Sequence, residues 1–291
     1  MIGRVGIVAK QGLTAAAPHL DNVVRWLAER RIEPVLETTT AALIGGPPGV
    51  ATASRDELPS RVDLLMVLGG DGTLLSIADR VGDAGRETPI LGINFGRLGF
   101  LTEVTLPEMF PALESVVQGT ALVVERAMLR VQNRRGDHVV EDRLLLNDVV
   151  VNRGSISRLI YLAVHVDDLF VTNVRADGLI IASPTGSTAY NLAAGGPIVH
   201  AGVDALLLTP IAPHSLGNRP IVVPGGSSIR VRPAADSGEE MFITYDGQRG
   251  APFESTDELY VTRAERVLRT IASPTRGYYD TLREKLRWGE R

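Results

Sequence analysis

The chain contains no cysteine and only two lysines, Lys10 and Lys285, in 291 residues. Without cysteine there can be no disulfide, no thiolate nucleophile and no cysteine-ligated zinc site. Arginine supplies nearly all the positive charge, so the chain has neither the Gly-Lys-[Ser/Thr] of a Walker-type loop nor the strand lysine of a protein kinase. A protein of this sequence that handles nucleoside triphosphates must therefore use another kind of loop.

The chain also lacks a strong net charge and a long apolar run. A formal charge of -4 leaves no electrostatic footprint for nucleic acid. No apolar run reaches the ~18 residues that a membrane span needs, and the N-terminus is typical of a short strand rather than a signal peptide. The five histidines show no metal-ligand spacing. We therefore expect a soluble, cytoplasmic protein with no nucleic-acid or membrane partner and no metal-ligand residues.

Strand-like and helix-like patterns alternate in the first hundred residues. Short apolar runs predict strands at 5–9, 32–36, 62–68 and 89–94. Helical periodicity predicts helices at 19–31 and from about 73 to 81. This alternation implies an α/β domain, a parallel sheet with flanking helices, and it places ligands beyond the carboxyl ends of the strands.

The pattern changes after a predicted helix at 107–118. Closely spaced strands are predicted at 127–131, 144–151, 159–166, 169–174, 179–182, 229–231, 241–245 and 259–262. Helical spacing returns from about residue 278. We predict an α/β domain over 1–100, joined by a C-terminal helix at 275–291, and a β-rich domain over 101–274.

The segment 68–74 carries the most informative local pattern. Gly69 and Gly70 end a predicted strand, Asp71 and Gly72 follow, and Thr73 could cap a helix. Glycines at this place let backbone N–H groups approach phosphate oxygens, and a lone carboxylate among them suits a group that handles a proton or a metal-bound phosphate. A tight turn with a solvated aspartate would show the same local pattern.

A second glycine-rich segment closes the first half. In 94–101, two glycines surround Arg97, which could place a guanidinium group near a phosphate. A structural turn clamped by Phe100 and Leu101 explains the same residues equally well.

In the second half, polar residues concentrate in two places. Asn147 and Asp148 lie between apolar strands and could bind a nucleoside base and ribose, although such a pair is also common in turns. In 177–197 a strand is followed by small hydroxylated residues, glycines and Tyr190. Close backbone approach, hydroxyl groups and an aromatic face together suit a nucleotide or dinucleotide.

At this point the combination resembles the NAD kinases, which phosphorylate the 2′-hydroxyl of the adenosine ribose of NAD to give NADP. The resemblance spans nearly the whole chain and rests on segments 69–73, 94–101, 147–148, 177–178, 184–191, 195–197 and 246–248. Segment 69–73 alone is a weak signal, because lipid kinases and phosphofructokinases carry similar loops. The Thr-Gly-Ser-Thr-Ala-Tyr run at 185–190 is more specific. The family more often has Glu where this chain has Asp148, and the shorter side chain keeps a ribose contact only if the backbone lies closer.

The resemblance implies a role for each matching residue. Asp71 is the expected proton acceptor for the 2′-hydroxyl. The expected dinucleotide contacts are Gly72, Asn147, Asp148, Arg158, Arg175, Asp177, Thr188, Ala189, Tyr190, Asn191, Leu192, Ala193, Ala212 and Gln248. It also implies that NAD is the substrate, that ATP with Mg²⁺ or another divalent metal is the donor, and that the protein is a homodimer or homotetramer with the pocket near subunit contacts.

Two other functions fit part of the sequence. A lipid or sphingoid-base kinase would share the glycine-aspartate loop but would leave the 185–191 segment unexplained. A non-catalytic NAD(H) sensor would account for the second half of the chain. It would have no need of a carboxylate inside a phosphate loop.

Overall fold

The computed structural model describes residues 2–154, 159–215, 217–234 and 240–289. These residues form two compact units, one of residues 1–125 and 268–291 and the other of residues 126–267. Both unit boundaries fall inside long strands, β7 (Val123–Arg135) and β18 (Asp257–Ile271), which contribute residues to both units. The domain limits predicted from the sequence, at residues 100/101 and 274/275, remain a prediction.

The first unit is built on a parallel sheet with strand order β3-β2-β1-β4-β5, followed by the short β6. Its strands are β1 (Arg4–Ala9), β2 (Glu33–Glu37), β3 (Ala51–Ala53), β4 (Leu64–Gly69), β5 (Ile90–Asn94) and β6 (Val104–Thr105). All residues of β4 and β5 are buried, as expected for strands covered by helices on both faces. The carboxyl ends of β1, β4 and β5 therefore lie next to one another in the sheet.

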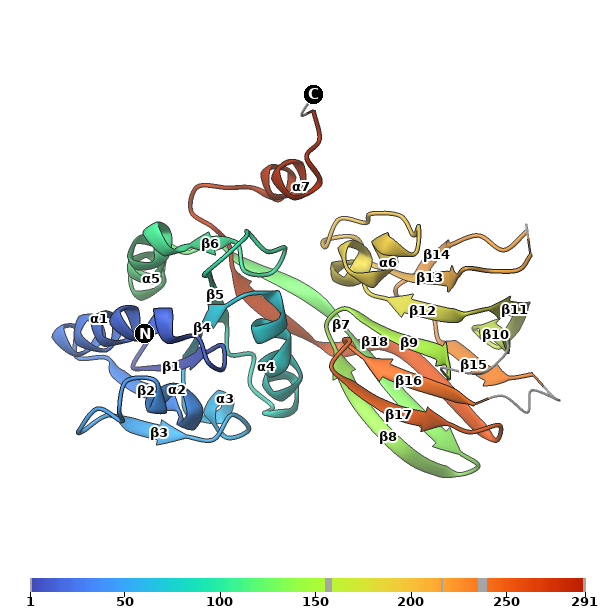
Figure 1. Cartoon of the computed structure of the whole chain (residues 1–291), viewed down its shortest axis with the longest axis horizontal. Helices are drawn as coiled ribbons and strands as arrows, with labels where there is room; N and C mark the ends of the chain where they lie inside the picture. The colour runs from blue at the N-terminus through green and yellow to red at the C-terminus, as the bar shows by residue number, and fades with distance from the viewer. Residues whose placement is uncertain (1, 155–158, 216, 235–239, 290–291) are drawn as a thin grey trace. The chain divides into compact units, whose positions relative to one another are not determined.

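The helices of this unit are α1 (Ala17–Glu29), α2 (Thr38–Ala42), α3 (Leu58–Arg61), α4 (Asp71–Asp83), α5 (Met109–Val117) and α7 (Tyr278–Leu286), and they are labelled in Figure 1. Helix α1 buries Leu20, Val23 and Leu27, which lie three and four residues apart and so share one face. That face packs into the same hydrophobic core as β1 and β4.

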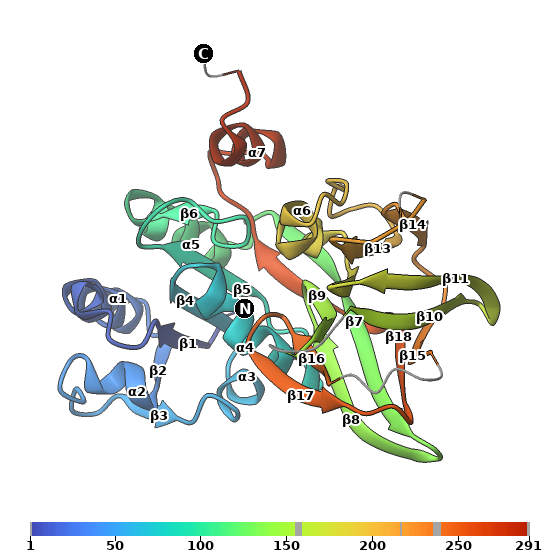
Figure 2. The same cartoon turned by 45° about the vertical axis from the view of Figure 1, so that its right-hand side comes forward.

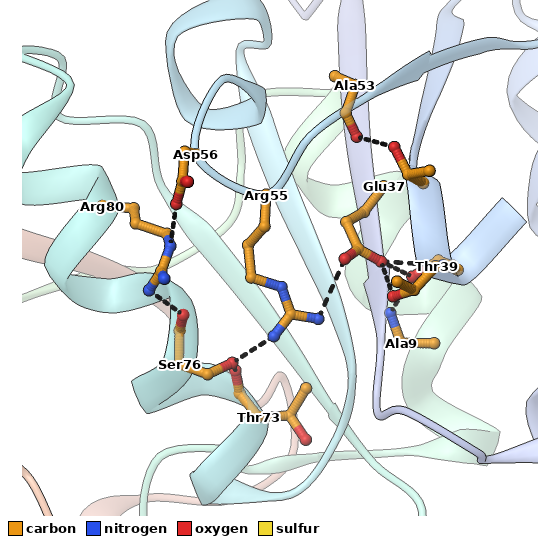
Figure 3. A network of polar contacts seen from close by, with 11 residues as sticks. Ala9, Glu37, Thr39, Ala53, Arg55, Asp56, Thr73, Ser76 and Arg80 are labelled. Carbon is orange, nitrogen blue, oxygen red and sulfur yellow. Dashed lines mark hydrogen bonds and ion pairs between the residues drawn. The ribbon is translucent and has the colours of Figure 1, made fainter. Parts of the chain in front are cut away.

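A polar network ties α2 and α4 to the sheet at its carboxyl end (Figure 3). The buried carboxylate of Glu37 accepts hydrogen bonds from the Thr40 N–H and hydroxyl, both at 2.8 Å, and pairs with Arg55 at 3.4 Å. Arg55 in turn donates to the Ser76 hydroxyl of α4 at 3.0 Å. Burial acts to raise the pKa of Glu37, but the hydrogen bonds from Thr39 and Thr40 and the charge of Arg55 outweigh it, so the pKa is lowered.

The second unit consists of two sheets whose apolar faces share one core. One sheet is antiparallel, in the order β14-β13-β12-β9-β16-β17. Its strands are β9 (Asp148–Arg153), β12 (Gly178–Ala182), β13 (Ala205–Ile211), β14 (Ile221–Pro224), β16 (Met241–Tyr245) and β17 (Arg249–Phe253). The other sheet contains β7, β8 (His138–Leu145), β10 (Ile160–Val166), β11 (Leu169–Ala176), β15 (Ile229–Pro233) and β18, and it is continuous with the parallel sheet of β1–β6 because β18 also pairs with β5. Figure 2 shows the strands of both sheets from a second direction.

The predicted fold class, an α/β region followed by a β-rich region, is confirmed. Two details were wrong. Helix α4 begins at Asp71 with Gly70 as its N-cap, so Thr73 lies inside the first turn and does not cap it. The predicted strand 144–151 is two strands, because β8 ends at Leu145 and β9 begins at Asp148.

Several short elements carried no clear sequence signal: α2, β3, α3, β13, β14 and β17. Proline explains part of this, since β13, β14 and β17 contain Pro210, Pro224 and Pro252, and proline weakens a strand pattern. Among the described residues, no helix is both long and apolar enough to span a membrane.

Candidate functional site

Asp71, the first residue of α4, has its carboxylate held by four donors of the segment that follows β5. Oδ1 accepts from the backbone N–H groups of Leu101 at 3.1 Å and Thr102 at 2.9 Å, and from the Thr102 hydroxyl at 2.9 Å. Oδ2 accepts from the Phe100 N–H at 2.8 Å. The carboxylate is therefore not a solvated turn side chain. Within the described part of the chain Oδ2 accepts this one bond, which leaves it capacity for a substrate hydroxyl.

The glycines around Asp71 serve two different purposes. A methyl group on Gly99 would lie 2.0 Å from Asp71 Oδ1, and one on Gly69 would lie 2.5 Å from the Thr73 hydroxyl oxygen. These two positions need glycine because neighbouring side chains pack against them. A methyl group on Gly70 or Gly72 would meet no protein atom within 4 Å. The space beside these two residues is open to a ligand such as a phosphate group.

In the second unit, three neighbouring strands of the six-stranded sheet end side by side, along the edge of the sheet that runs across the strands. Ala182, the last residue of β12, pairs with Asp148, the first of β9, and Tyr245 at the end of β16 pairs with Val149. The sequence predicted site residues in all three of these segments without showing that the segments adjoin. Their meeting brings Asn147 and Asp148 next to the loop that begins at Ser183.

Asp246 braces this edge. Its carboxylate accepts the backbone N–H groups of Leu146, Asn147 and Asp148 at 2.9, 2.8 and 3.0 Å. Its own N–H donates to the Asp148 carbonyl at 2.9 Å. These bonds hold the short segment between β8 and β9, where the chain passes from one sheet to the other. Sequence reasoning noted the Asp246-Gly247-Gln248 motif but did not identify this role, and an Asp-Gly pair between two strands is the turn signal that could have drawn attention to it.

The loop after β12 is fastened to the same place. The Ser183 N–H donates to the Asn147 carbonyl at 2.9 Å and the Ser183 hydroxyl to the Leu146 carbonyl at 2.5 Å. A methyl group on Gly186 would lie 2.1 Å from the Asn147 carbonyl oxygen. Gly186 is thus required by the close approach of two backbones, and the loop cannot move away from Asn147 without breaking these contacts.

Asn191 has both ends of its amide engaged by protein groups. Nδ2 donates to the carbonyls of Ser187 at 3.0 Å and Pro197 at 3.1 Å, while Oδ1 accepts from the Thr209 hydroxyl at 2.6 Å. The side chain is fully buried. Asn191 therefore shapes the loop, and its amide is not available to a ligand in this arrangement.

The other predicted residues of this loop are more accessible. Thr188, Ala189 and Leu192 are half-buried, and Ala193 is exposed. Tyr190 is 45% exposed, so one face of its ring is free to pack against a planar group. Gln248 lies at the same edge, since its N–H donates to the Tyr245 carbonyl at 3.0 Å in the turn that carries Asp246.

Asp148 is a buried carboxylate, 4% exposed, at the centre of this edge. Burial, and then the negative charge of Asp246, raise the pKa of Asp148 to about 7. Among the described residues no hydrogen bond to its carboxylate is present. Such a group is costly to bury, and ligand hydroxyls that donate to it would satisfy it.

Three predicted residues lie at the opposite end of the sheet. Arg175, Asp177 and Ala212 flank the other ends of β12 and β13, where the Asp177 N–H donates to the Ile211 carbonyl at 3.0 Å. Asp177 also pairs with Arg153 at 3.0 Å, a partner that the sequence did not indicate. The six-residue distance from Asp177 to Ser183 corresponds to about 20 Å of extended strand. The structure therefore separates the predicted pocket residues into two groups. Arg158 lies outside the described residues.

Within the described ranges, no group of three or more His, Asp or Glu side chains is placed to hold a metal ion.

Two family models match the chain. The ATP-NAD kinase N-terminal domain matches residues 5–121, and the ATP-NAD kinase C-terminal domain matches residues 146–273. Among similar proteins, the NAD kinase of Geotalea daltonii is 46% identical over 288 residues, which cover 99% of each chain. The NAD kinase of Geobacter metallireducens is 45% identical over 269 residues, covering 92% of this chain and 93% of that one.

Two solved structures have similar folds. Yeast NADH kinase, crystallised in complex with NADH, superposes with a TM-score of 0.91 at 27% identity and covers 100% of this chain and 89% of its own. An NAD kinase from Archaeoglobus fulgidus in complex with ATP has a TM-score of 0.76 at 27% identity, with 97% and 99% covered.

The close contact at Gly99 predicts a stability effect. In Gly99→Ala, the new methyl group must displace the Asp71 carboxylate, and overpacking of this kind costs about 1–3 kcal/mol. The melting temperature should fall accordingly in a thermal unfolding experiment. Gly96→Ala is the matched control, because its methyl group meets no atom within 4 Å. Equal melting temperatures for the two variants would contradict the contact.

The buried Asp148 predicts a pH dependence of stability. The pKa of this carboxyl is about 7 in the folded protein and near 3.8 when unfolded, so between these values the folded state binds more protons. The free energy of unfolding should therefore fall as the pH rises through this window. Asp148→Asn should remove this pH-dependent change in the free energy of unfolding, which is on the order of a few kcal/mol. Urea unfolding of ligand-free protein at about pH 5 and about pH 8 measures it. The same pH dependence in both proteins would refute the assignment.

Proposed function

The chain belongs to the NAD kinase family, and from this premise we propose how its residues transfer the γ-phosphate of ATP to the 2′-hydroxyl of the adenosine ribose of NAD, giving NADP. The observation that supports the proposal best is the fixed carboxylate of Asp71, whose Oδ2 can accept a hydroxyl proton. A hydroxyl group is a weak nucleophile until its proton is taken, so a base within hydrogen-bond reach is required.

In the proposed reaction, Asp71 accepts the proton of the 2′-hydroxyl as its oxygen attacks the γ-phosphorus atom. The new P–O bond forms on the ribose, the bond to the β-phosphate oxygen breaks, and ADP leaves. Catalysis of this kind depends mostly on positioning and on neutralising charge. The four hydrogen bonds to Asp71 provide the positioning of the base, because they fix the carboxylate before substrate binds.

We propose that the phosphates of ATP lie at the start of α4. The open space beside Gly70 and Gly72 would accommodate phosphate oxygens, and the N-terminus of this 13-residue helix favours negative charge. The donor would carry Mg²⁺ or another divalent metal, which neutralises phosphate charge and is usually held mainly by phosphate oxygens and water.

For the acceptor, we propose that NAD binds at the edge of the six-stranded sheet that Asp246 braces. The unpartnered carboxylate of Asp148 would accept ribose hydroxyls, Asn147 would bind the base or amide, and Tyr190 would offer its ring. Thr188, Ala189, Leu192, Ala193 and Gln248 would line the same place. Asn191 contributes to this site by shaping the loop, since its amide is engaged by the protein.

The remaining predicted contacts lead us to propose a homo-oligomer. Arg175, Asp177 and Ala212 lie about 20 Å along the strand from the braced edge, at its opposite end. A homodimer or homotetramer could bring this end of one subunit to the dinucleotide bound by another. Each site would then contain residues from two subunits.

Neither of the other two functions accounts for these features as well. A sensor that only binds NAD(H) has no use for a carboxylate fixed by four donors beside open space for phosphates. A lipid kinase would need the glycine-aspartate loop at 69–73. It would have no need of the loop after β12, whose residues Ser183 and Gly186 contact the segment 146–147.

Asp71→Asn tests the proposed base. The turnover number for NADP formation from NAD and Mg-ATP should fall by about 10²–10⁴-fold, because the amide cannot accept the proton, while NAD affinity stays nearly unchanged. Thr102→Val is the matched control. It removes one hydrogen bond to Asp71 and the acceptor of the Asn94 amide but keeps the carboxylate, so the turnover number should fall by less than about tenfold. Thermal unfolding of both variants checks that they are folded.

A turnover number near that of the wild type in Asp71→Asn would show that another group is the base. No NADP formation by folded wild-type protein, compared with a heat-inactivated sample, would reject the proposed activity as a whole.

The shared-site proposal predicts complementation between inactive variants. Asn147→Ala removes a proposed contact to NAD at the edge that Asp246 braces, and Asp177→Ala removes one at the opposite end of the sheet. Each variant alone should therefore have low activity. When both are co-expressed as equal partners of a dimer, about a quarter of the wild-type activity should return, because half the dimers are mixed and each has one intact site of two. No recovery in mixed dimers purified through two different tags would show that each subunit builds its site alone.

A further inference from the structure

Lys10, one of only two lysines in the chain, lies directly beside the loop that carries Asp71. It follows the last residue of β1, and its N–H donates to the carbonyl of Leu68 in β4 at 2.8 Å. Its Cβ atom is 3.2 Å from the place where a methyl group on Gly69 would be. The side chain therefore starts alongside Gly69 at the carboxyl edge of the sheet.

Arg97 is an exposed residue of the segment on the other side of the same loop. It belongs to the segment after β5, which lies on the opposite side of β4 from β1. This segment is tied to the loop at two points, because the Phe95 N–H donates to the Gly69 carbonyl at 3.0 Å and the Phe100 N–H to Asp71 at 2.8 Å. Lys10 and Arg97 thus flank Gly69 and Asp71 from the two neighbouring strands.

Two other cations of this unit, Arg55 and Arg80, are already paired. Arg55 pairs with the buried Glu37 at 3.4 Å and donates to Ser76, and Arg80 pairs with Asp56 at 2.5 Å (Figure 3). In the described part of the chain the exposed side chains of Lys10 and Arg97 have no ion pair or hydrogen bond. Their charges are therefore available to a ligand at this edge.

The chemistry of the donor requires such charges. A nucleoside triphosphate carries several negative charges, and one divalent metal neutralises only part of them. The lysine of a Walker loop supplies a further positive charge in many kinases, and this chain has no such loop. A lysine provides a mobile point charge, and an arginine provides a planar fork that matches two phosphate oxygens.

We propose that Lys10 and Arg97 form a two-cation clamp on the donor triphosphate, one from each side of the Gly69–Gly72 loop. The proposal rests on the proposed function, in that the donor binds at the start of α4. The clamp replaces the single lysine of a Walker loop with two side chains from neighbouring strand ends. It acts on the donor and leaves the dinucleotide site unchanged.

Steady-state kinetics with ATP varied at saturating NAD test the clamp. Lys10→Ala and Arg97→Ala should each raise KM for ATP by about 10- to 100-fold, the usual effect of losing a charge-assisted contact, with KM for NAD changed less than about twofold. Lys10→Arg and Arg97→Lys keep the charge and should recover part of the loss. Arg25→Ala is the matched control, because Arg25 is an exposed cation of α1 with no ion pair or hydrogen bond among the described residues, and its KM for ATP should equal that of the wild type.

Binding of Mg-ADP, measured by calorimetry, gives a second readout that needs no turnover. Weakened Mg-ADP binding in Lys10→Ala and Arg97→Ala, with unchanged melting temperatures, supports the clamp even for a preparation that forms no NADP. A wild type that forms NADP, with an unchanged KM for ATP in either alanine variant, overturns the two-cation arrangement and leaves the proposed function standing. A folded wild type that binds Mg-ADP but forms no NADP rejects the proposed function alone.

Discussion

In each unit, the candidate site depends on one carboxylate that accepts hydrogen bonds from several consecutive backbone N–H groups. The Asp71 carboxylate accepts hydrogen bonds from the N–H groups of residues 100–102, and the Asp246 carboxylate accepts them from those of residues 146–148. At the end of a strand such groups lose their partners in the sheet, and leaving them unpaired in a partly buried place is costly. A carboxylate can satisfy three at once, so it fixes a short irregular segment as firmly as strand pairing would.

These braces determine which polar groups remain for chemistry. Glu37, Asp246 and Asn191 use their hydrogen-bonding capacity inside the protein, and in the case of Asp246 the bonded groups are 99 residues apart in sequence. Asp71 and Asp148 are different, because each retains capacity to accept a hydroxyl. Polar groups that are fully hydrogen-bonded within the protein lie around these two carboxylates. They hold the carboxylates in place and leave them able to accept a hydrogen bond from a ligand.

The raised pKa of Asp148 shows the electrostatic cost of this arrangement. The carboxyl lies beside Asp246, whose charge is needed to hold the backbone, and it is also removed from water. Both effects disfavour its ionised form. Ribose hydroxyls that donate to the carboxylate, as in the proposed binding of NAD, would offset that cost.

The fold class, the Gly-Gly-Asp-Gly-Thr loop and the candidate segments of the site could all be predicted from the sequence. These features are local: apolar periodicity distinguishes buried strands from helices, and glycines beside one carboxylate are visible within five residues. The tertiary structure alone decided that Gly99 must lack a side chain and that Asp246 braces residue 147. It also decided that Asn191 is engaged internally and that Asp177 lies at the other end of the sheet from Asp148. The contacts among these join residues up to about a hundred positions apart, and strand direction and pairing, which no local pattern encodes, determine which of them meet.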